Sequence, residues 1–464
     1  MTNWLPSLEG RPGPRYLAIA DALASDVAEG NLKPGERLPT HRDLGWKLGV
    51  TVGTVSRAYA EAERRGLVSG EVGRGTFVRN LAARDSHTVM TERLSAPGTV
   101  NLNFAFPPPA EDTRAIETTL EDLAKDPVVS LLLDYNPHAG LERHRTAAAT
   151  WLARSGLKVS PERIVLTAGA QHAISVCLAA TTRPGDRILA DNLTYSGMQV
   201  AARLLGLRLE GLASDEQGTL PDAFEAACRG NDVKALYCMP TMHNPTTITM
   251  PDERRRAIAE IARKHEVAII EDDIFGLLVE SPRTPISAYV PEQGFFLTSL
   301  SKTVAPGLRI GYAAGPERAS ERLAAAVRAS CWMATPLTAE IATRWIEDGT
   351  ADRILEGRRR EAAARREIAL GILGKWQPLC PPGSIYLWLT LPESWRAPDF
   401  ALEAQRRDVA VTPADACAVG RHDVPSAIRV CLGAPKSRDH LRRGLETLAR
   451  LLDDGPSPSF GSIV

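Results

Sequence analysis

The stretch SLSKTVAPGLRIGY, residues 299–312, sets a lysine after two serines and places an arginine seven residues beyond that lysine. It continues the apolar run GFFLTSL (294–300), which has the length and composition of a buried strand. A lysine in a loop broken by proline and glycine is ordinarily a solvated charge. After a buried strand, however, it can anchor a covalently bound cofactor. The segments around it decide between these two interpretations.

Four further apolar runs are similar to the run that precedes the lysine. They are RIVLT (163–167), RILAD (187–191), ALYCMP (235–240) and VAIIEDD (267–273). Segments with helical spacing of apolar residues, such as DERRRAIAEIARKH (252–265), lie between them. Strands that alternate with helices predict an α/β domain with a mainly parallel sheet.

Small and polar residues follow these runs, at the strand ends where parallel sheets gather their binding groups. In chain order they are Ala168, Gly169, Ala170 and Gln171, then Tyr195, then His243, Asn244, Pro245 and Thr246, then Asp272 and Asp273, and finally Ser299, Ser301, Lys302 and Arg309. Small residues that open a helix leave N–H groups free to bind phosphate, and an aromatic side chain can stack on a flat ring. Each residue alone is ordinary, but their joint occurrence in this order predicts a cofactor site.

This order of phosphate cradle, stacking ring, amide, carboxylate and lysine resembles the fold-type I pyridoxal-phosphate enzymes of the aminotransferase class, over residues 100–450. The resemblance implies that Lys302 forms a Schiff base with the aldehyde of pyridoxal 5'-phosphate and that Asp272 pairs with the protonated pyridine nitrogen. It also implies that Asn244 hydrogen-bonds the phenolic oxygen of the cofactor. The implied phosphate ligands are Ser299, Ser301, Arg309 and the amides of Ala170 and Gln171.

Two more segments extend the resemblance. LLLDYNPHAGLERHR (131–145) is similar to the segment whose tyrosine, here Tyr135, reaches the cofactor phosphate of a partner subunit, which implies a homodimer. AIRVCLG (427–433) places Arg429 where the family binds the α-carboxylate of its substrate. A guanidinium suits that bidentate task. The alternative for Arg429 is an ordinary charge at a strand edge.

The chain also departs from the aminotransferase pattern. Ile274 and Phe275 stand where the family usually has a tyrosine, shortly after the aspartate that pairs with the cofactor. Ala170 replaces a frequent serine, and NPTT (244–247) replaces the usual NPTG. A missing phenol would change the protonation of the bound cofactor, which weakens the expectation of efficient transamination.

The amino-terminal segment predicts a separate unit of three helices. YLAIADALASDVAEG (16–30) has the apolar spacing of an amphipathic helix that ends at a glycine. Thr40, followed by Asp43, marks the start of a short second helix, which Gly49 closes. Thr51 can cap a third helix. Two helices joined by a tight turn, with a longer second helix, are typical of a helix-turn-helix.

A hairpin is predicted after these helices, and together they resemble a known DNA-binding domain. LVSGEVGRGTFV (67–78) reads as two strands around a glycine-rich turn. The strings GNLKPGERLP, LGVTVGTVSRAYAEAERRGLV and GRGTFV resemble the GntR-type winged helix-turn-helix, which implies that the third helix enters the major groove of double-stranded DNA. The predicted DNA contacts are Arg42, Thr51, Thr54, Arg57 and Arg74. The alternative is a small helical bundle with solvated charges.

The sequence therefore predicts a winged helix-turn-helix over residues 1–79, a linker over 80–98 and an aminotransferase-like domain over 99–464, with a smaller carboxyl-terminal α+β subdomain. This architecture resembles the MocR subfamily of bacterial transcription regulators. The resemblance implies a homodimer in which an amino compound or a cofactor vitamer reacts at Lys302 and repositions the DNA-binding heads. Two alternatives stay open: an active aminotransferase that carries a DNA-binding appendage, and a constitutive DNA binder that uses the cofactor only for folding.

Composition excludes several other classes. Of the 464 residues, 44% are hydrophobic and 24% charged, as in ordinary globular proteins. We expect a cytoplasmic protein without a membrane span, because no leader pattern and no apolar run of about 18 residues is present. The seven cysteines are scattered singly without a C-x-x-C pair, which argues against a disulfide framework and a metal site and favours small buried side chains.

Overall fold

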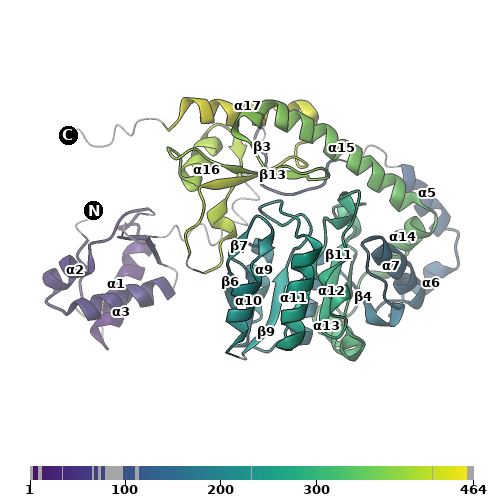
Figure 1. The fold of residues 1–464 in the computed structure, drawn as a ribbon, viewed down its shortest axis with the longest axis horizontal. Coiled ribbons are helices and arrows are strands. Elements are labelled where there is room, and N and C mark those ends of the chain that lie inside the picture. Colours follow the sequence, from purple (N-terminus) through teal and green to yellow (C-terminus); the bar gives the residue numbers. More distant parts are fainter. Residues whose placement is uncertain are drawn as a thin grey trace. The chain divides into compact units, whose positions relative to one another are not determined.

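The computed structural model describes residues 4–8, 13–33, 35–64, 67–71, 75–78, 98–109, 114–230, 232–420 and 422–456. The chain forms two compact units, Met1–Pro97 and Gly98–Val464 (Figure 1). Residues 80–97 of the predicted linker lie outside the described residues. Each unit has a hydrophobic core of its own.

The first unit consists of three helices and a hairpin. Its elements are α1 (Arg15–Ala28), α2 (His41–Leu48), α3 (Val52–Arg64), β1 (Val68–Glu71) and β2 (Gly75–Val78). The two strands are antiparallel, with Val68 opposite Val78. Ile19, Leu23 and Val55 are fully buried between the helices. The predicted winged helix-turn-helix fold is confirmed.

Local capping chemistry sets the boundaries of α2 and α3. The Thr40 side chain accepts a hydrogen bond from the Asp43 N–H at the start of α2. Gly49 ends α2 in the left-handed region, with φ of 64°. The Thr51 Oγ1 then accepts from the Thr54 N–H at 3.1 Å, at the start of α3. These contacts satisfy backbone groups that helix ends leave free, so the three boundaries predicted from the sequence are confirmed.

A seven-stranded sheet of order β4-β12-β11-β10-β9-β5-β6 forms the centre of the second unit. Its strands are β4 (Ile164–Thr167), β5 (Arg187–Asp191), β6 (Arg208–Leu212), β9 (Val233–Cys238), β10 (Ala268–Asp272), β11 (Gly294–Ser299) and β12 (Gly311–Ala314). Strand β12 runs antiparallel to both of its neighbours, and the other pairs are parallel. The predicted mainly parallel sheet is confirmed.

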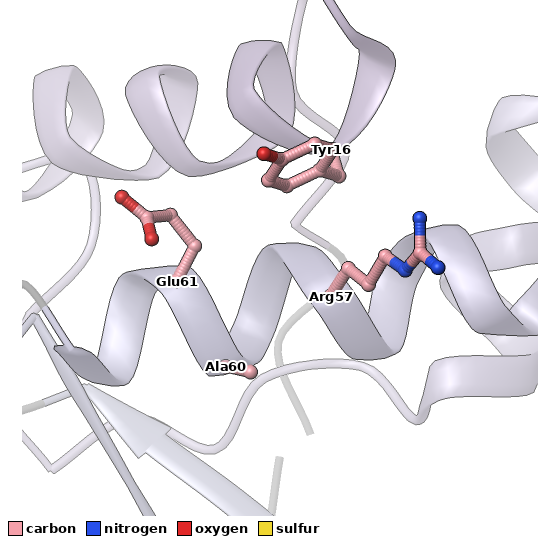
Figure 2. A pocket seen from close by; sticks show the side chains of 4 residues that line it. All are labelled: Tyr16, Arg57, Ala60 and Glu61. Carbon is pink, nitrogen blue, oxygen red and sulfur yellow. The ribbon is translucent and has the colours of Figure 1, made fainter.

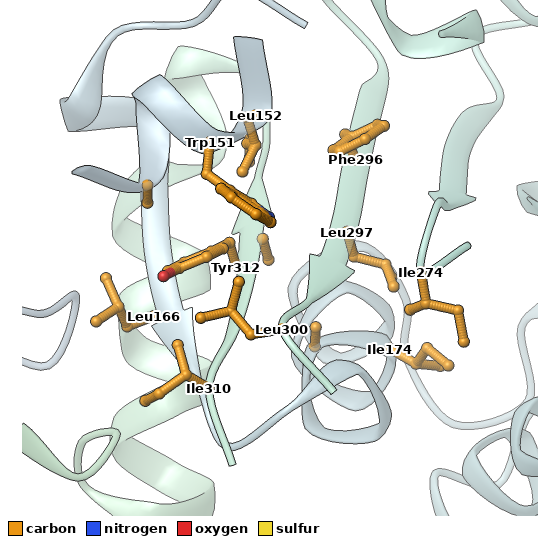
Figure 3. Packing of buried hydrophobic residues seen from close by; sticks show 14 of the residues in the cluster. Trp151, Leu152, Leu166, Ile174, Ile274, Phe296, Leu297, Leu300, Ile310 and Tyr312 are labelled. Carbon is orange, nitrogen blue, oxygen red and sulfur yellow. The ribbon is translucent and has the colours of Figure 1, made fainter. Parts of the chain in front are cut away.

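Helices cover both faces of this sheet. Along β5, Leu189 packs with the apolar cluster of α10 (Pro221–Cys228) and α11 (Asp252–Lys264), whereas its neighbour Ile188 packs into the opposite cluster, with α8 (Ala170–Thr181). This alternation follows from the two-residue period of a strand. Figure 1 shows α10 and α11 in front of the sheet, and Figure 3 shows part of the cluster on the other face. Strands buried on both faces explain the continuous apolar runs in the sequence.

Further helices complete this large part of the second unit. They are α5 (Arg114–Leu123), α6 (Val128–Leu132), α7 (Glu142–Arg154), α9 (Ser196–Leu204), α12 (Ile286–Tyr289), α13 (Ser320–Cys331), α14 (Pro336–Glu347) and the 24-residue α15 (Thr350–Leu373). Within the described parts of the chain, no helix combines the length and apolar character that a membrane span requires.

A smaller α+β subdomain packs around its own apolar cluster, as the sequence predicted. It contains an antiparallel sheet of order β13-β16-β15, made of β13 (Tyr386–Thr390), β16 (Ala427–Cys431) and β15 (Thr412–Pro413), with helices α16 (Ala397–Arg406) and α17 (Arg438–Asp454). Strand β3 (Val100–Asn101) pairs with β14 (Val409–Ala410). This pairing brings the segment after residue 98 into the subdomain.

The cysteine prediction is wrong at one position. Six cysteines are buried, but Cys331 is exposed. It is the last residue of α13, where the helix reaches the surface. All seven cysteines are isolated in the sequence, so their spacing does not distinguish Cys331 from the six that are buried.

Candidate functional site

Lys302 lies just beyond the carboxyl end of β11 with its side chain turned inward. Its Nζ donates a hydrogen bond to the Ala105 carbonyl at 2.7 Å and lies 5.9 Å from the centre of the Phe106 ring. Burial lowers the pKa of Lys302 to about 8, because the charged ammonium loses its hydration. A substantial fraction of this amine is therefore neutral near physiological pH, which is the form that attacks an aldehyde.

Asp272 ends β10 and is completely buried. The Tyr237 hydroxyl donates to its Oδ2 at 2.7 Å, whereas Oδ1 has no hydrogen-bond partner among the described residues. Burial raises the pKa of Asp272 to about 7, although the bond from Tyr237, the nearby Ile274 N–H and the charge of Lys302 oppose that shift. A buried carboxylate oxygen without a partner is unusual, and a pyridinium N–H would satisfy it.

Arg429 is buried in the middle strand of the three-stranded sheet, so the alternative of an ordinary strand-edge charge is excluded. Its guanidinium donates to the Asn244 Oδ1 at 2.5 Å, to the Asn103 carbonyl at 2.7 Å and to the Thr412 Oγ1 at 3.1 Å. All three acceptors are neutral, and its Nε has no partner within the described chain. A carboxylate can accept two parallel hydrogen bonds from a guanidinium, so Arg429 can bind a carboxylate.

A cradle of small and basic groups forms where α8 begins. Gly169 precedes the helix with φ of 86°, and Arg309 donates to the Ala168 carbonyl at 3.0 Å. A Cβ on Gly169 would collide with that guanidinium, so the glycine makes room for it. Arg309 also donates to the Ser301 Oγ at 3.4 Å. Free N–H groups of a helix start beside a guanidinium suit a phosphate group.

The remaining members of the predicted set lie around this cradle. The Ser299 Oγ accepts from the Ser301 N–H at 3.4 Å. Tyr195 precedes α9, and the Gln171 amide donates to the Gly197 carbonyl at 2.9 Å. A Cβ on Gly197 would collide with both the Tyr195 ring and the Gln171 side chain. The glycine therefore leaves room for the Tyr195 ring and the Gln171 side chain.

The charged groups of this cluster are close enough to act on one another's pKa. The charges of Arg429, Asp272 and Arg309 all act on the pKa of Lys302. The same three groups act on the pKa of Tyr195, which burial raises. The structure thus brings together residues from β10, β11, β16 and the loops that follow, which the sequence had placed only by their order.

Tyr135, the predicted contact with a partner's cofactor phosphate, lies on the surface of this single chain. Its side chain is 79% exposed, and its ring lies 5.7 Å from the ring of Trp332. Leu131 and Leu133 are exposed nearby in sequence, so this region presents apolar side chains to solvent. The structure does not join Tyr135 to the buried cluster around Lys302.

Sequence reasoning missed several residues of the site. Tyr237 is the next-to-last residue of β9, where the sequence shows it as one apolar residue among others. Asn103, Ala105 and Phe106 precede the first long helix of the unit in a segment without strand or helix period. The pairing of β3 with β14 positions this segment, and its hydrogen bonds with Lys302 and Arg429 show that it borders the site.

Two apolar side chains stand where the aminotransferase family usually has a tyrosine. Ile274 and Phe275 are both buried, and the Phe275 ring lies 5.3 Å from the Tyr386 ring. The Tyr386 hydroxyl donates to the Met242 carbonyl at 2.6 Å. The Tyr386 hydroxyl is thus already hydrogen-bonded to the backbone.

The cofactor-free protein is expected to become less stable relative to an Asp272→Asn variant as the pH rises. Folded Asp272 keeps its proton to a pKa of about 7, whereas the ordinary value is 3.8. The folded state therefore binds the extra proton between about pH 4 and pH 7, and the contribution of Asp272 to stability falls through that window. The three-unit difference corresponds to at most about 4 kcal/mol.

Asparagine can still accept the Tyr237 hydrogen bond, so the comparison isolates the titration. Urea denaturation of both cofactor-free proteins at pH 4, 6 and 8 measures it. Asp273, whose pKa burial also raises to about 8, is present in both proteins. A stability difference that stays constant with pH would contradict the assignment of a raised pKa to Asp272.

Two of the predicted DNA contacts are exposed cations of the first unit. Arg42 and Arg57 are exposed, and within the described residues neither forms a hydrogen bond or an ion pair. The Thr51 and Thr54 hydroxyls lie 2.9 Å apart and bond each other at the start of α3. Arg74, the fifth predicted contact, lies outside the described residues. Exposed arginines on a helix-turn-helix are the groups that contact DNA phosphates and base edges.

A pocket of about 360 Å³ lies between α1 and α3, lined by Tyr16, Arg57, Ala60 and Glu61 (Figure 2). In Figure 2 the guanidinium of Arg57 and the carboxylate of Glu61 point in opposite directions along α3. The residues that line this pocket all belong to the first unit, whereas Lys302 and the groups that act on it belong to the second.

Comparison with known proteins assigns both units to families. Residues 112–448 match the family described as "Aminotransferase class I and II", and residues 15–78 match "Bacterial regulatory proteins, gntR family". The chain belongs to the class I and II aminotransferase family and carries a gntR-type helix-turn-helix domain ahead of it.

Relatives and solved structures agree with this assignment. The uncharacterized HTH-type transcriptional regulator YdeF of Bacillus subtilis is 32% identical over 97% of each chain. The HTH-type pyridoxine biosynthesis transcriptional regulator PdxR of Corynebacterium glutamicum is 29% identical, over 77% of this chain and 78% of the relative. Kynurenine aminotransferase of Pyrococcus horikoshii, solved with PMP, covers 81% of this chain and 95% of its own at a TM-score of 0.73 and 22% identity, which shows the fold. The protein is a MocR-type HTH transcriptional regulator with an aminotransferase-like domain.

Proposed function

We propose that this regulator binds pyridoxal 5'-phosphate at Lys302, senses an amino compound or a cofactor vitamer there, and so adjusts the affinity of a homodimer for operator DNA. The observation that carries the proposal is the buried, unpartnered Oδ1 of Asp272 in electrostatic contact with the Lys302 amine. Burying a carboxylate or an amine without a partner costs free energy. A protonated pyridine nitrogen would pair with Asp272, and an aldehyde would react with Lys302.

Each residue of the site has a distinct task in this proposal. Lys302 presents a partly neutral amine, and Asp272 holds a proton on the ring nitrogen. Arg309 and the free N–H groups of α8 hold the phosphate, with the hydroxyls of Ser299 and Ser301 beside them. Once bound, the cofactor supplies an aldehyde and an electron-withdrawing ring. The names of two solved relatives, with PMP and with a phosphopyridoxyl-leucine, support the choice of cofactor.

The effector is proposed to bind between Arg429 and Lys302. Arg429 offers a buried cation without an acidic partner, which favours an amino compound that carries a carboxylate. Phe106 is 51% exposed beside the Lys302 amine and adds an apolar wall. The effector amine would replace the Lys302 amine on the cofactor, and Arg429 would bind the effector carboxylate. These two interactions supply the difference in affinity between two arrangements of the dimer that a ligand-driven rearrangement needs.

The homodimer is proposed from the surface around Tyr135. The side chains of Leu131, Leu133 and Tyr135 are each at least half exposed. Apolar side chains gathered on a surface mark an interaction site, and a second copy of the chain can cover them. Tyr135 then lies where it can reach the partner's cofactor phosphate.

An active aminotransferase with a DNA-binding appendage is the second candidate. The lowered pKa of Lys302 favours it, because an amine that titrates near physiological pH can carry a proton between reacting atoms. Against it, Phe275 gives no hydroxyl to the site. A constitutive DNA binder, the third possibility, predicts no response to any amine.

The proposal predicts that Arg429→Gln selectively loses its response to amino acids. A titration of the cofactor-loaded protein with amino acids and with simple amines, followed by visible absorbance, measures the response. Loss of one charge-assisted pair weakens binding of a carboxylate by about 10- to 150-fold, while a simple amine is affected little.

Adding a keto acid then separates the candidates. A spectral change that persists supports a sensor, whereas repeated conversion of amino acid and keto acid identifies a working enzyme. Equal loss of the response to amines and amino acids in Arg429→Gln would contradict the carboxylate site.

A further inference from the structure

We propose that helix α3 reads a thymine methyl group through Val52, at a point where Gly53 lets DNA approach the helix backbone. The inference rests on the DNA-binding function of the first unit and adds the class of base pair that it selects. It predicts an A·T pair under the first turn of α3 in each half-site of the operator.

The polar side chains at the start of α3 already form hydrogen bonds within the protein. The Thr51 Oγ1 accepts from the Thr54 N–H at 3.1 Å, and the two hydroxyls bond each other at 2.9 Å. The Ser56 hydroxyl lies 3.2 Å from the His41 Nδ1, within hydrogen-bond distance. These groups stabilise the turn and the contact between α2 and α3, so they are poorly placed to discriminate bases.

Val52 is an apolar side chain left in solvent at the position where this fold meets DNA. It is the first residue of α3 and 46% exposed, whereas Val55, Ala58 and Tyr59 form the buried face of the helix. A valine has no donor or acceptor with which to read a base edge. In the major groove, apolar side chains contact the C5-methyl group of thymine, which no other base presents.

Gly53 is not required by the fold. A Cβ built there would meet only the Thr51 Oγ1, at an ordinary 3.8 Å. Gly45 in α2 is different, because its Cβ would lie 3.1 Å from the Val50 carbonyl, inside the tight turn. A bare backbone at Gly53 therefore serves close approach from outside the protein.

Arg57 completes the reading surface. It lies four residues beyond Gly53, on the same face of the helix and about 6 Å along it, and is exposed. Its guanidinium can bond a phosphate or a guanine while Val52 contacts the thymine.

The test uses the full-length holoprotein and the smallest duplex from its own upstream region that it protects from nuclease. Each thymine is replaced in turn by deoxyuridine, which lacks the methyl group. We expect one thymine per half-site at which the replacement weakens binding about four-fold, as loss of one buried methyl group predicts. Val52→Ala should bind the two duplexes equally.

Two further variants separate this inference from general damage. Gly53→Ala should leave the melting temperature unchanged or raised and weaken binding to the unmodified duplex at least ten-fold. Val200→Ala, at a valine that is 48% exposed on α9, should change neither property. Binding without any methyl effect, or full affinity of Gly53→Ala, overturns this inference alone. Failure of the wild-type protein to bind any upstream duplex overturns the DNA-binding function as well.

Discussion

Replacing Lys302 by alanine is expected to abolish both the visible absorbance of protein-bound pyridoxal phosphate and its covalent fixation by borohydride. The effect should be complete, because the Lys302 amine is the group that the site presents in neutral form, with a pKa lowered to about 8. Peptide mass spectrometry after reduction locates the label in the wild-type protein. The alanine variant can still bind the phosphate through Arg309, but only reversibly.

Lys264→Ala provides the matched control for this experiment. Lys264 is a solvent-exposed lysine at the end of α11 that pairs with Glu225, so its loss should leave the label unchanged. Circular dichroism checks that both variants remain folded. A label of undiminished yield on another lysine would show that the cofactor anchor lies elsewhere.

The second large effect is expected at the DNA-binding head, where Arg57→Ala should weaken binding to the upstream duplex by about 5- to 150-fold. Arg57 is exposed and makes no ion pair among the described residues, so its whole charge is available to DNA. If it contacts a phosphate, the slope of log affinity against log salt should also fall by about one. Fluorescence anisotropy over a range of salt concentrations measures both quantities.

Arg229→Ala serves as the control, because Arg229 is an exposed arginine at the end of α10 in the second unit. It should bind DNA like the wild type. Wild-type affinity that does not depend on salt would contradict an electrostatic contact by the head.

Local chemistry made much of the fold predictable. Thr40 and Gly49 fix helix ends through contacts within a few residues, so the sequence shows them directly. The buried strands read as continuous apolar runs, and parallel strands collect their following residues at one edge. Lys302 and Asp272 could therefore be expected to lie in the same site before any contact was known.

Contacts between residues far apart in the sequence could not be predicted in this way. Asn103 meets Thr412 across 309 residues of chain, and only the pairing of β3 with β14 explains how. Tyr237 gives no sign in the sequence that its hydroxyl bonds Asp272. Strand β12 has only four residues and was not predicted, since it follows the lysine loop without a helix between. The surface position of Cys331 likewise depends on where α13 ends.

The proposed function requires a coupling between Lys302 and the DNA-binding head, which one measurement tests most directly. The affinity of the cofactor-loaded protein for its upstream duplex is measured at increasing concentrations of the amino acid that changes its visible spectrum. We predict at least a five-fold change in affinity, half complete at the concentration that half completes the spectral change. DNA affinity that stays constant while the spectrum changes would contradict the account.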